Sequence, residues 1–145
     1  MANKRYFLAL AGLLVAALAV TAQNKGPETY KTRLFALPAD AKTRPDLAGS
    51  GNVTGTLNGN KLTIAGTFEG LKSAATSAKI HNAVAAGVRG PAIADLTVTK
   101  SPSGSISGSA DLTAPQLENL RKGGIYVQLY SEKAADGVLW GWLLK

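Results

Sequence analysis

Cysteine does not occur in this 145-residue sequence, which excludes disulfides, thiolate metal sites and a lipid-modified cysteine. Histidine occurs only once, as His81, and tryptophan occurs twice. One histidine without cysteine cannot supply the ligands of an ordinary zinc or copper site. We therefore expect no bound metal and no cofactor, and a domain that depends on its apolar core alone for stability.

Acidic residues are also scarce: the sequence has 16 basic and only 9 acidic residues, which gives a net charge of +7. Lys4 and Arg5 belong to the first 22 residues, so the chain from residue 23 onward has 14 basic and 9 acidic residues, or +5. The basic residues are spread along the chain and no nucleic-acid motif accompanies them. This indicates a mildly positive soluble surface and no nucleic-acid partner, with weak attraction to an anionic membrane or polymer as the alternative.

The first 22 residues have the pattern of a signal peptide. Lys4 and Arg5 precede an apolar run over 6–20, and residues 20–22 (VTA) place small side chains where a signal peptidase reads them. We predict cleavage before Gln23 and a protein that is periplasmic, secreted or at the cell surface. The alternative is an uncleaved N-terminal membrane anchor, although the run is short for a bilayer crossing of about 20 residues.

Residues 23–145 are expected to form one domain that is rich in strands. The clearest local signal is Asn58-Gly59 between alternating runs at 51–57 and 61–68, which predicts a β-hairpin. Further strands are predicted at 30–37, 76–82, 93–99, 105–112, 125–131 and 138–144.

One helix is predicted over 114–122. Thr113 is a suitable N-cap and Gln116 lies three residues later, which is the pattern of a capping box. Pro115 is tolerated in the first turn, and Gly123-Gly124 ends the helix.

Together these elements predict an all-β fold, either an antiparallel β-sandwich or a Greek-key barrel, with one short helix. Alternation along the strands and the helix selects the side chains expected in the core. They are Leu34, Val53, Leu57, Leu62, Ile64, Phe68, Ile80, Leu96, Val98, Leu117, Leu120, Val127, Leu129, Leu139 and Leu143.

The order and spacing of several motifs resemble the chordin-type (CHRD) domain, a module of secreted proteins. The motifs are residues 78–82 (AKIHN), 112–117 (LTAPQL), 124–131 (GIYVQLYS) and 137–142 (GVLWGW). The resemblance implies a CHRD-like β domain over 23–145, of superoxide-dismutase-like or immunoglobulin-like type. It implies no particular reaction, because the CHRD family has no agreed biochemical activity.

The sequence departs from the family pattern at its histidine and glutamate positions. The family usually has His-x-His where this chain has residues 79–81 (KIH), and Asn-Val-His-Thr where it has 128–131 (QLYS). It usually ends with Gly-Glu-Ile-Arg-Gly-Gln, in place of residues 137–142. A His-x-His pair on a strand is a plausible metal clamp, but Lys79 puts a cation in one of its positions. We therefore interpret His81 as a hydrogen-bonded, half-buried strand residue.

Catalytic arrangements are missing too. No Gly-x-Ser-x-Gly nucleophile elbow precedes a helix, and the aspartates fall mostly in loops or at strand ends. Gly87 and Gly90 frame a loop with no following helix to hold a phosphate. The sequence therefore predicts a protein that is not an enzyme and has no catalytic residues.

The positions that differ from the family pattern are expected to share one face, because residues two apart on a strand point the same way. Val138 is expected on the same face, beside the two tryptophans. This face is either covered within the molecule or is an exposed aromatic platform that binds a partner. The candidate binding residues are Lys79, His81, Tyr126, Gln128, Tyr130, Trp140 and Trp142.

The leading functional prediction is an exported, non-enzymatic binding or assembly module. Its partner would be another protein or a second copy of itself, bound through the aromatic face. One alternative is a metal-binding or redox protein of superoxide-dismutase-like fold. Another is a membrane-anchored accessory subunit of an envelope complex, which requires residues 6–22 to be retained.

Overall fold

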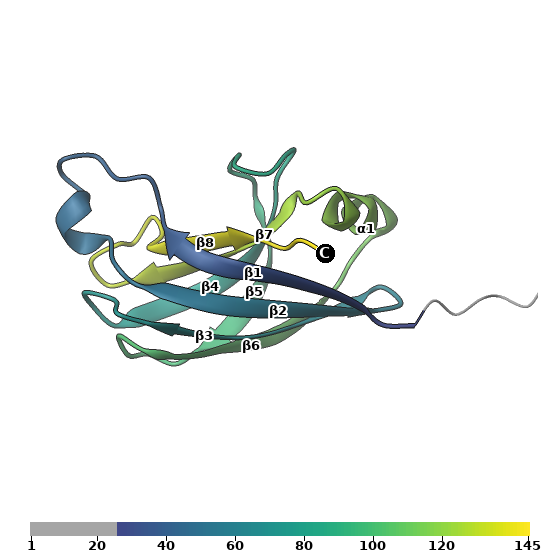
Figure 1. Ribbon diagram of the computed structural model, residues 1–145, viewed down its shortest axis with the longest axis horizontal. Helices are drawn as coiled ribbons and strands as arrows, with labels where there is room; N and C mark the ends of the chain where they lie inside the picture. The colour runs from purple at the N-terminus through teal and green to yellow at the C-terminus, as the bar shows by residue number, and fades with distance from the viewer. Residues whose placement is uncertain (1–25) are drawn as a thin grey trace, which may run out of the picture.

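The computed structural model describes residues 26–145, so the predicted leader and its cleavage site lie outside the described residues. Within this range the chain forms eight strands, one short 3-10 helix and one α-helix (Figure 1). The strands are β1 (Glu28–Ala36), β2 (Ser50–Asn58), β3 (Lys61–Glu69), β4 (Ala75–Asn82), β5 (Ala92–Val98), β6 (Gly104–Asp111), β7 (Ile125–Ser131) and β8 (Leu139–Trp142).

The strands close into an antiparallel barrel in the order β1-β2-β3-β6-β5-β4-β7-β8. The ladders differ in length, since β2 and β3 share nine residue pairs whereas β5 and β6 share two. The all-β class, the barrel and the single short α-helix confirm the prediction from the sequence. The β-sandwich, the Greek-key connections and the superoxide-dismutase-like or immunoglobulin-like topology stay predictions.

The predicted hairpin is present as β2 and β3. Asn58 pairs with Lys61 at its end, and Gly59 has a φ of +64°, a left-handed conformation that glycine adopts without strain. The local sequence therefore fixes this turn without help from the rest of the fold.

The α-helix α1 (Ala114–Arg121) lies at the same end of the barrel as the C-terminus (Figure 1). The predicted capping box is present, because the Thr113 side chain accepts from the Gln116 amide while the Gln116 side chain accepts from the Thr113 amide. Leu120 is buried against the core. No helix within residues 26–145 has the length and apolar character needed to cross a membrane.

The main core fills the barrel and contains most of the predicted side chains. Thirteen of the fifteen are buried, and Val98 and Leu117 are partly buried against them. Tyr30, Ile106 and Ile125 are also fully buried there. Alternation therefore assigned the faces of the strands correctly.

The last strand differs from the prediction. β8 ends at Trp142, and Leu144 forms only an isolated bridge with Lys31. The placement of Val138 beside the tryptophans is wrong, because Val138 packs in the main core. Val138 precedes β8, just after Gly137 with a φ of +120°, so the alternation of the strand does not extend to it.

Candidate functional site

The outer face of β4, β7 and β8 brings the predicted binding residues together. Directly paired residues of antiparallel strands have neighbouring side chains on one face. Two rows cross the three strands: Lys79, Gln128 and Trp140 form one row, and His81, Tyr126 and Trp142 form the other. Tyr130 lies on the same side of β7 as Gln128 and Tyr126.

Five buried residues on this face form a second apolar cluster, which we call the outer aromatic cluster: Leu37, Ala83, Tyr126, Trp140 and Trp142. The two indole rings lie edge to face with centroids 4.7 Å apart, and Tyr126 lies 4.8 Å from Trp142. The exposed fractions of Trp140 and Trp142 are only 6% and 7%. The covered interpretation is therefore confirmed, and the expectation that both tryptophans form an exposed platform is wrong.

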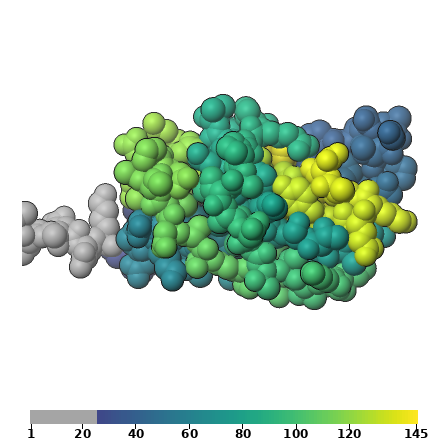
Figure 2. Space-filling model, turned by 180° about the vertical axis from the view of Figure 1, so that it is seen from behind, coloured from purple at the N-terminus to yellow at the C-terminus, as the bar shows by residue number. Residues whose placement is uncertain are grey.

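Two loops supply the cover. Residues 83–91 join β4 to β5 and place the Arg89 guanidinium 5.5 Å from the Trp140 ring centre. Residues 37–49 join β1 to β2, contain the 3-10 helix Arg44–Asp46, and pack Leu47 against the cluster. In Figure 2 the teal segment around residues 83–91 and the blue loop rise from the same side of the molecule, with yellow C-terminal residues between them.

The loop 83–91 is held to the barrel at Gly90. The His81 ring donates from Nδ1 to the Gly90 carbonyl oxygen over 2.8 Å. The Tyr126 hydroxyl accepts from the Gly90 amide at 3.1 Å and lies 3.3 Å from the Gly90 oxygen. A Cβ at Gly90 would overlap the carbonyl of Asn82, so only glycine fits at this point. We call these contacts the Gly90 latch.

The latch determines the protonation of His81. A carbonyl oxygen only accepts hydrogen bonds, so Nδ1 carries the proton, and the Nε2 of the neutral ring accepts from the Tyr130 hydroxyl over 2.8 Å. Burial lowers the pKa of His81 and outweighs the bond to Gly90, and the charges of Lys79 and Arg89 lower the pKa further. Burial also raises the pKa of Tyr130. His81 is thus a neutral structural residue with both ring nitrogens engaged.

Lys79 turns away from the cluster and pairs with Asp95 of β5, with 3.4 Å between Nζ and Oδ1. The Asp95 side chain is 84% exposed and that of Lys79 is 38% exposed, so solvent screens this pair and it contributes at most about 1 kcal/mol. Among residues 26–145 no three histidine or acidic side chains gather as a metal site. That the protein binds no metal or cofactor stays a prediction.

Four buried side-chain polar atoms have no hydrogen-bond partner within residues 26–145. They are Oε1 of Gln128, Oγ of Ser131 and Nε1 of both tryptophans. The Gln128 side chain is anchored at its other end, where Nε2 donates to the Asp136 carbonyl oxygen over 3.0 Å.

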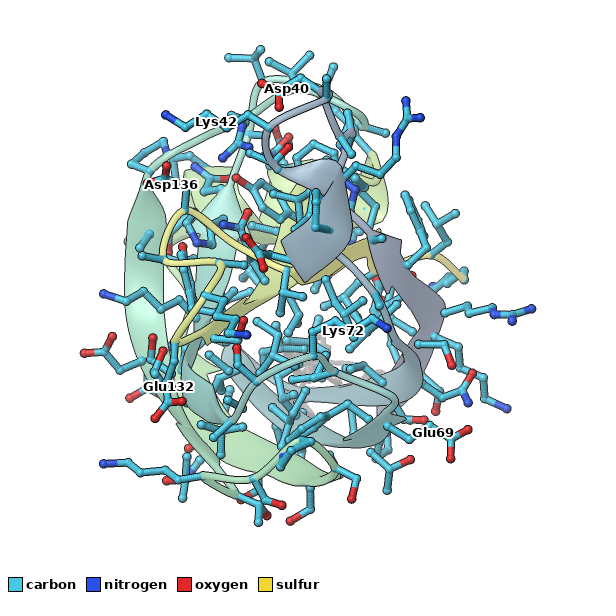
Figure 3. The ribbon with its side chains drawn as sticks, turned by 90° about the vertical axis from the view of Figure 1, so that its left-hand side faces the viewer. Asp40, Lys42, Glu69, Lys72, Glu132 and Asp136 are labelled. Carbon is cyan, nitrogen blue, oxygen red and sulfur yellow. The ribbon has the colours of Figure 1, made fainter. Side chains whose placement is uncertain are left out.

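A cavity of about 380 Å³ lies between the loop 37–49, Arg89 and residues 133–137. Its walls carry charges of both signs, and Figure 3 shows Asp40, Lys42 and Asp136 toward one end of the molecule. The charged lining residues are Asp40, Lys42, Asp46, Arg89, Lys133 and Asp136. Sequence reasoning missed this cavity, because its walls are polar loops without periodicity or motif.

A family model described as the CHRD domain matches residues 34–143. This chain belongs to the CHRD domain family. No curated protein and no solved structure matches it. CHRD domains occur in extracellular or exported proteins, and they are in general binding modules without catalytic activity.

The match begins in β1 and ends beyond β8, so nearly the whole barrel belongs to the CHRD domain. Of the positions expected to depart from the family pattern, Lys79, Gln128, Tyr130, Trp140 and Trp142 lie on the outer face of β4, β7 and β8, whereas Val138 packs in the main core. In this CHRD domain the outer face is partly apolar and is closed by two loops.

Proposed function

We propose that this CHRD domain is an exported, non-catalytic binding module that docks a protein on the face above the outer aromatic cluster. The docked protein is a separate partner or a second copy of the chain. The observation that carries the proposal is that two large apolar side chains on segments flanking the cluster, Phe35 and Val88, are exposed; we call them the apolar rim. These residues are 50% and 44% exposed.

The rim is continuous with the cluster and with Arg89. Phe35 pairs with Trp140 across the β1–β8 ladder, and Val88 directly precedes the arginine that covers Trp140. Protein interfaces are enriched in aromatic residues and arginine at the centre, with polar groups around them. Large apolar side chains exposed together are the usual sign of such a surface.

The chemistry of the face favours binding over catalysis. The single histidine is held neutral and has both ring nitrogens in hydrogen bonds, so no free general base is available there. No observation within residues 26–145 favours the metal-binding or redox alternative.

The test uses the full chain with Phe35→Ser and Val88→Ser combined. Sedimentation measures self-association, and cross-linked capture from the exported fraction of the producing cell measures partner binding. We expect the double variant to lose the complex that the wild type forms, with an unchanged circular dichroism spectrum.

Leu144→Ser is the matched control, because Leu144 is equally exposed at 54% but lies toward the other end of β1, opposite Lys31. It should retain the complex. If the Phe35 and Val88 variant binds as the wild type does, this face is not the docking surface and the proposal fails.

A further inference from the structure

We propose that the cavity between the two loops binds a carboxylate of an acidic peptide segment, and that Arg89 is its anchor. This inference rests on the proposed function, since it names the chemistry of the partner that docks on the same face.

The Arg89 side chain makes few polar contacts within its own chain. Its guanidinium lies over Trp140, 5.5 Å from the ring centre, which is within the range of a cation–π contact. Within residues 26–145 its side chain makes a single hydrogen bond, from Nη1 to the Asp136 oxygen at the long distance of 3.5 Å. A guanidinium is planar, and one with free donors is suited to bind a carboxylate through two parallel hydrogen bonds.

The other charges in the cavity favour a peptide over a simple anion. Lys42 and Lys133 add two cations, while Asp46 and Asp136 contribute carboxylates. None of the ion pairs within the described chain involves these residues. A polyanion would be repelled by the two carboxylates. A peptide instead offers a carboxylate to the cations and N–H donors to the aspartates.

Asp40 is a different case, because its carboxylate is used within the loop. Its Oδ1 accepts from the amides of Lys42 and Thr43 at 2.9 and 2.8 Å, and from the Thr43 hydroxyl at 3.0 Å. These bonds lower the pKa of Asp40 and hold the loop in shape. The loop therefore keeps Lys42 at the cavity by means of an internal hydrogen-bond network.

The amide of Gln128 supports the wall of the cavity beside Arg89. Gln128 is 2% exposed, and its Nε2 donates to the Asp136 carbonyl oxygen over 3.0 Å. Any Cβ at Gly137, which lines the cavity, would overlap this Nε2. The buried amide therefore fixes residues 136 and 137 in the wall, where Asp136 also accepts from Arg89.

The apolar rim favours a protein over an acidic polysaccharide as the partner. Phe35 and Val88 stand beside Arg89 and would contact apolar side chains flanking the carboxylate. The formal charge of +5 on the chain from residue 23 onward, with 14 basic and 9 acidic residues, attracts an acidic partner over longer distances. An acidic peptide with apolar neighbours therefore matches both parts of the surface.

The experiment titrates the ¹⁵N-labelled full chain with the peptide Ac-Leu-Asp-Leu-NH₂. The readouts are the Arg89 Nε–H and Trp140 Nε1–H signals in heteronuclear NMR spectra. The matched probe Ac-Leu-Asn-Leu-NH₂ replaces the carboxylate by an amide of the same shape. We expect saturable shifts with the acidic peptide and at least about tenfold weaker binding of the amide peptide.

Three variants locate the contact. Arg89→Gln should weaken binding by about tenfold or more, and Arg89→Lys should recover only part of it, because lysine keeps the charge but lacks the fork. Arg44→Gln is the matched control, since Arg44 belongs to the same loop system but does not line the cavity. It should bind within about twofold of the wild type, as expected for a charge outside direct contact.

Equal binding of the two peptides, or no effect of Arg89→Gln, overturns the inference. Tighter binding of inorganic phosphate or glucuronate than of the acidic peptide overturns the choice of a peptide. If the peptide fails to bind while the Phe35 and Val88 variant still loses its complex, the carboxylate inference falls and the proposed function stands. If the peptide does not bind and the Phe35 and Val88 variant keeps its complex, both the carboxylate inference and the proposed function fail.

Discussion

Phe35 and Trp140 face each other across the β1–β8 ladder, yet Phe35 is 50% exposed and Trp140 only 6%. The boundary of the loop cover therefore runs between these two neighbouring rings. Arg89 and the loop 37–49 cover Trp140, and β1 carries Phe35 outward beyond them. A partner that covers Phe35 would also meet Arg89, which is why the two proposals share one face.

Trp140→Ala should lower the free energy of unfolding by about 3–5 kcal/mol, because it empties the centre of a buried cluster. Urea denaturation of the full chain, followed by circular dichroism, measures the loss. The matched change Phe35→Ala removes a half-exposed ring from the opposite position and should cost clearly less. Equal costs for the two changes would contradict the described cover.

Gly90→Ala should release the loop 83–91, since the new Cβ overlaps Asn82 and breaks the latch with His81 and Tyr126. We expect red-shifted tryptophan emission, stronger acrylamide quenching and a stability loss of about 1–3 kcal/mol. Gly87→Ala is the control in the same loop, where a Cβ meets no atom within 4 Å. Its φ of +81° makes that change strained, but the strain stays at the loop tip.

Stability should fall as the pH drops below the ordinary histidine pKa of 6.5. The folded state lowers the pKa of His81, so the unfolded chain takes up its proton first and acid favours unfolding. The loss continues until the pH passes the folded pKa of His81. Glu28 and Asp40 begin to contribute only at lower pH, near their ordinary values of 4.5 and 3.8.

Thermal melts of the wild type and His81→Gln between about pH 5 and 7.5 measure this effect, because ordinary carboxyl groups titrate below that window. The chain has no second histidine, so the slope in this window should disappear in the variant. An unchanged slope would assign the dependence to another group.

Leu129→Ala should cost about 2–5 kcal/mol, because Leu129 is completely buried in the main core and pairs with Leu139 of β8. Chemical denaturation gives the value. A cost below about 1 kcal/mol would mean that β7 is shifted by one residue, which exchanges the two faces of a strand.

Zinc or copper added to the full chain should be removed by dialysis against a chelator, leaving far less than one ion per chain. His81 uses Nδ1 to hold Gly90 and Nε2 to accept from Tyr130, so a metal would have to break one of these bonds. Elemental analysis of the dialysed protein provides the check. One ion retained per chain would point to a site shared between two chains.

The features that the sequence predicted best are those that depend on neighbouring residues. Asn58-Gly59 specifies its own turn, and Thr113 with Gln116 specifies the start of α1. Burial followed from alternation at Leu129 because a strand has a fixed period of two. Alternation gave the wrong face for Val138, because this residue lies just before the start of β8.

The cover of the tryptophans could not be predicted in the same way. Whether Trp140 is buried depends on Arg89 and Leu47, which lie 51 and 93 positions away in the sequence, in loops without a periodic pattern. The cavity likewise forms only when three separate segments meet at one end of the barrel. Sequence reasoning found the residues of the face but not what lies above them.

The Gly90 latch also bears on how this surface can change during evolution. Residues 84–88 are exposed, and their side chains are absent from both apolar clusters. Substitutions at Val84, Ala85, Ala86 and Val88 should therefore change the folding energy little, provided that Gly90 and the rings of His81 and Tyr126 remain. A duplicated copy of the gene can acquire a new binding preference there by ordinary genetic drift, without first acquiring compensating stabilising mutations.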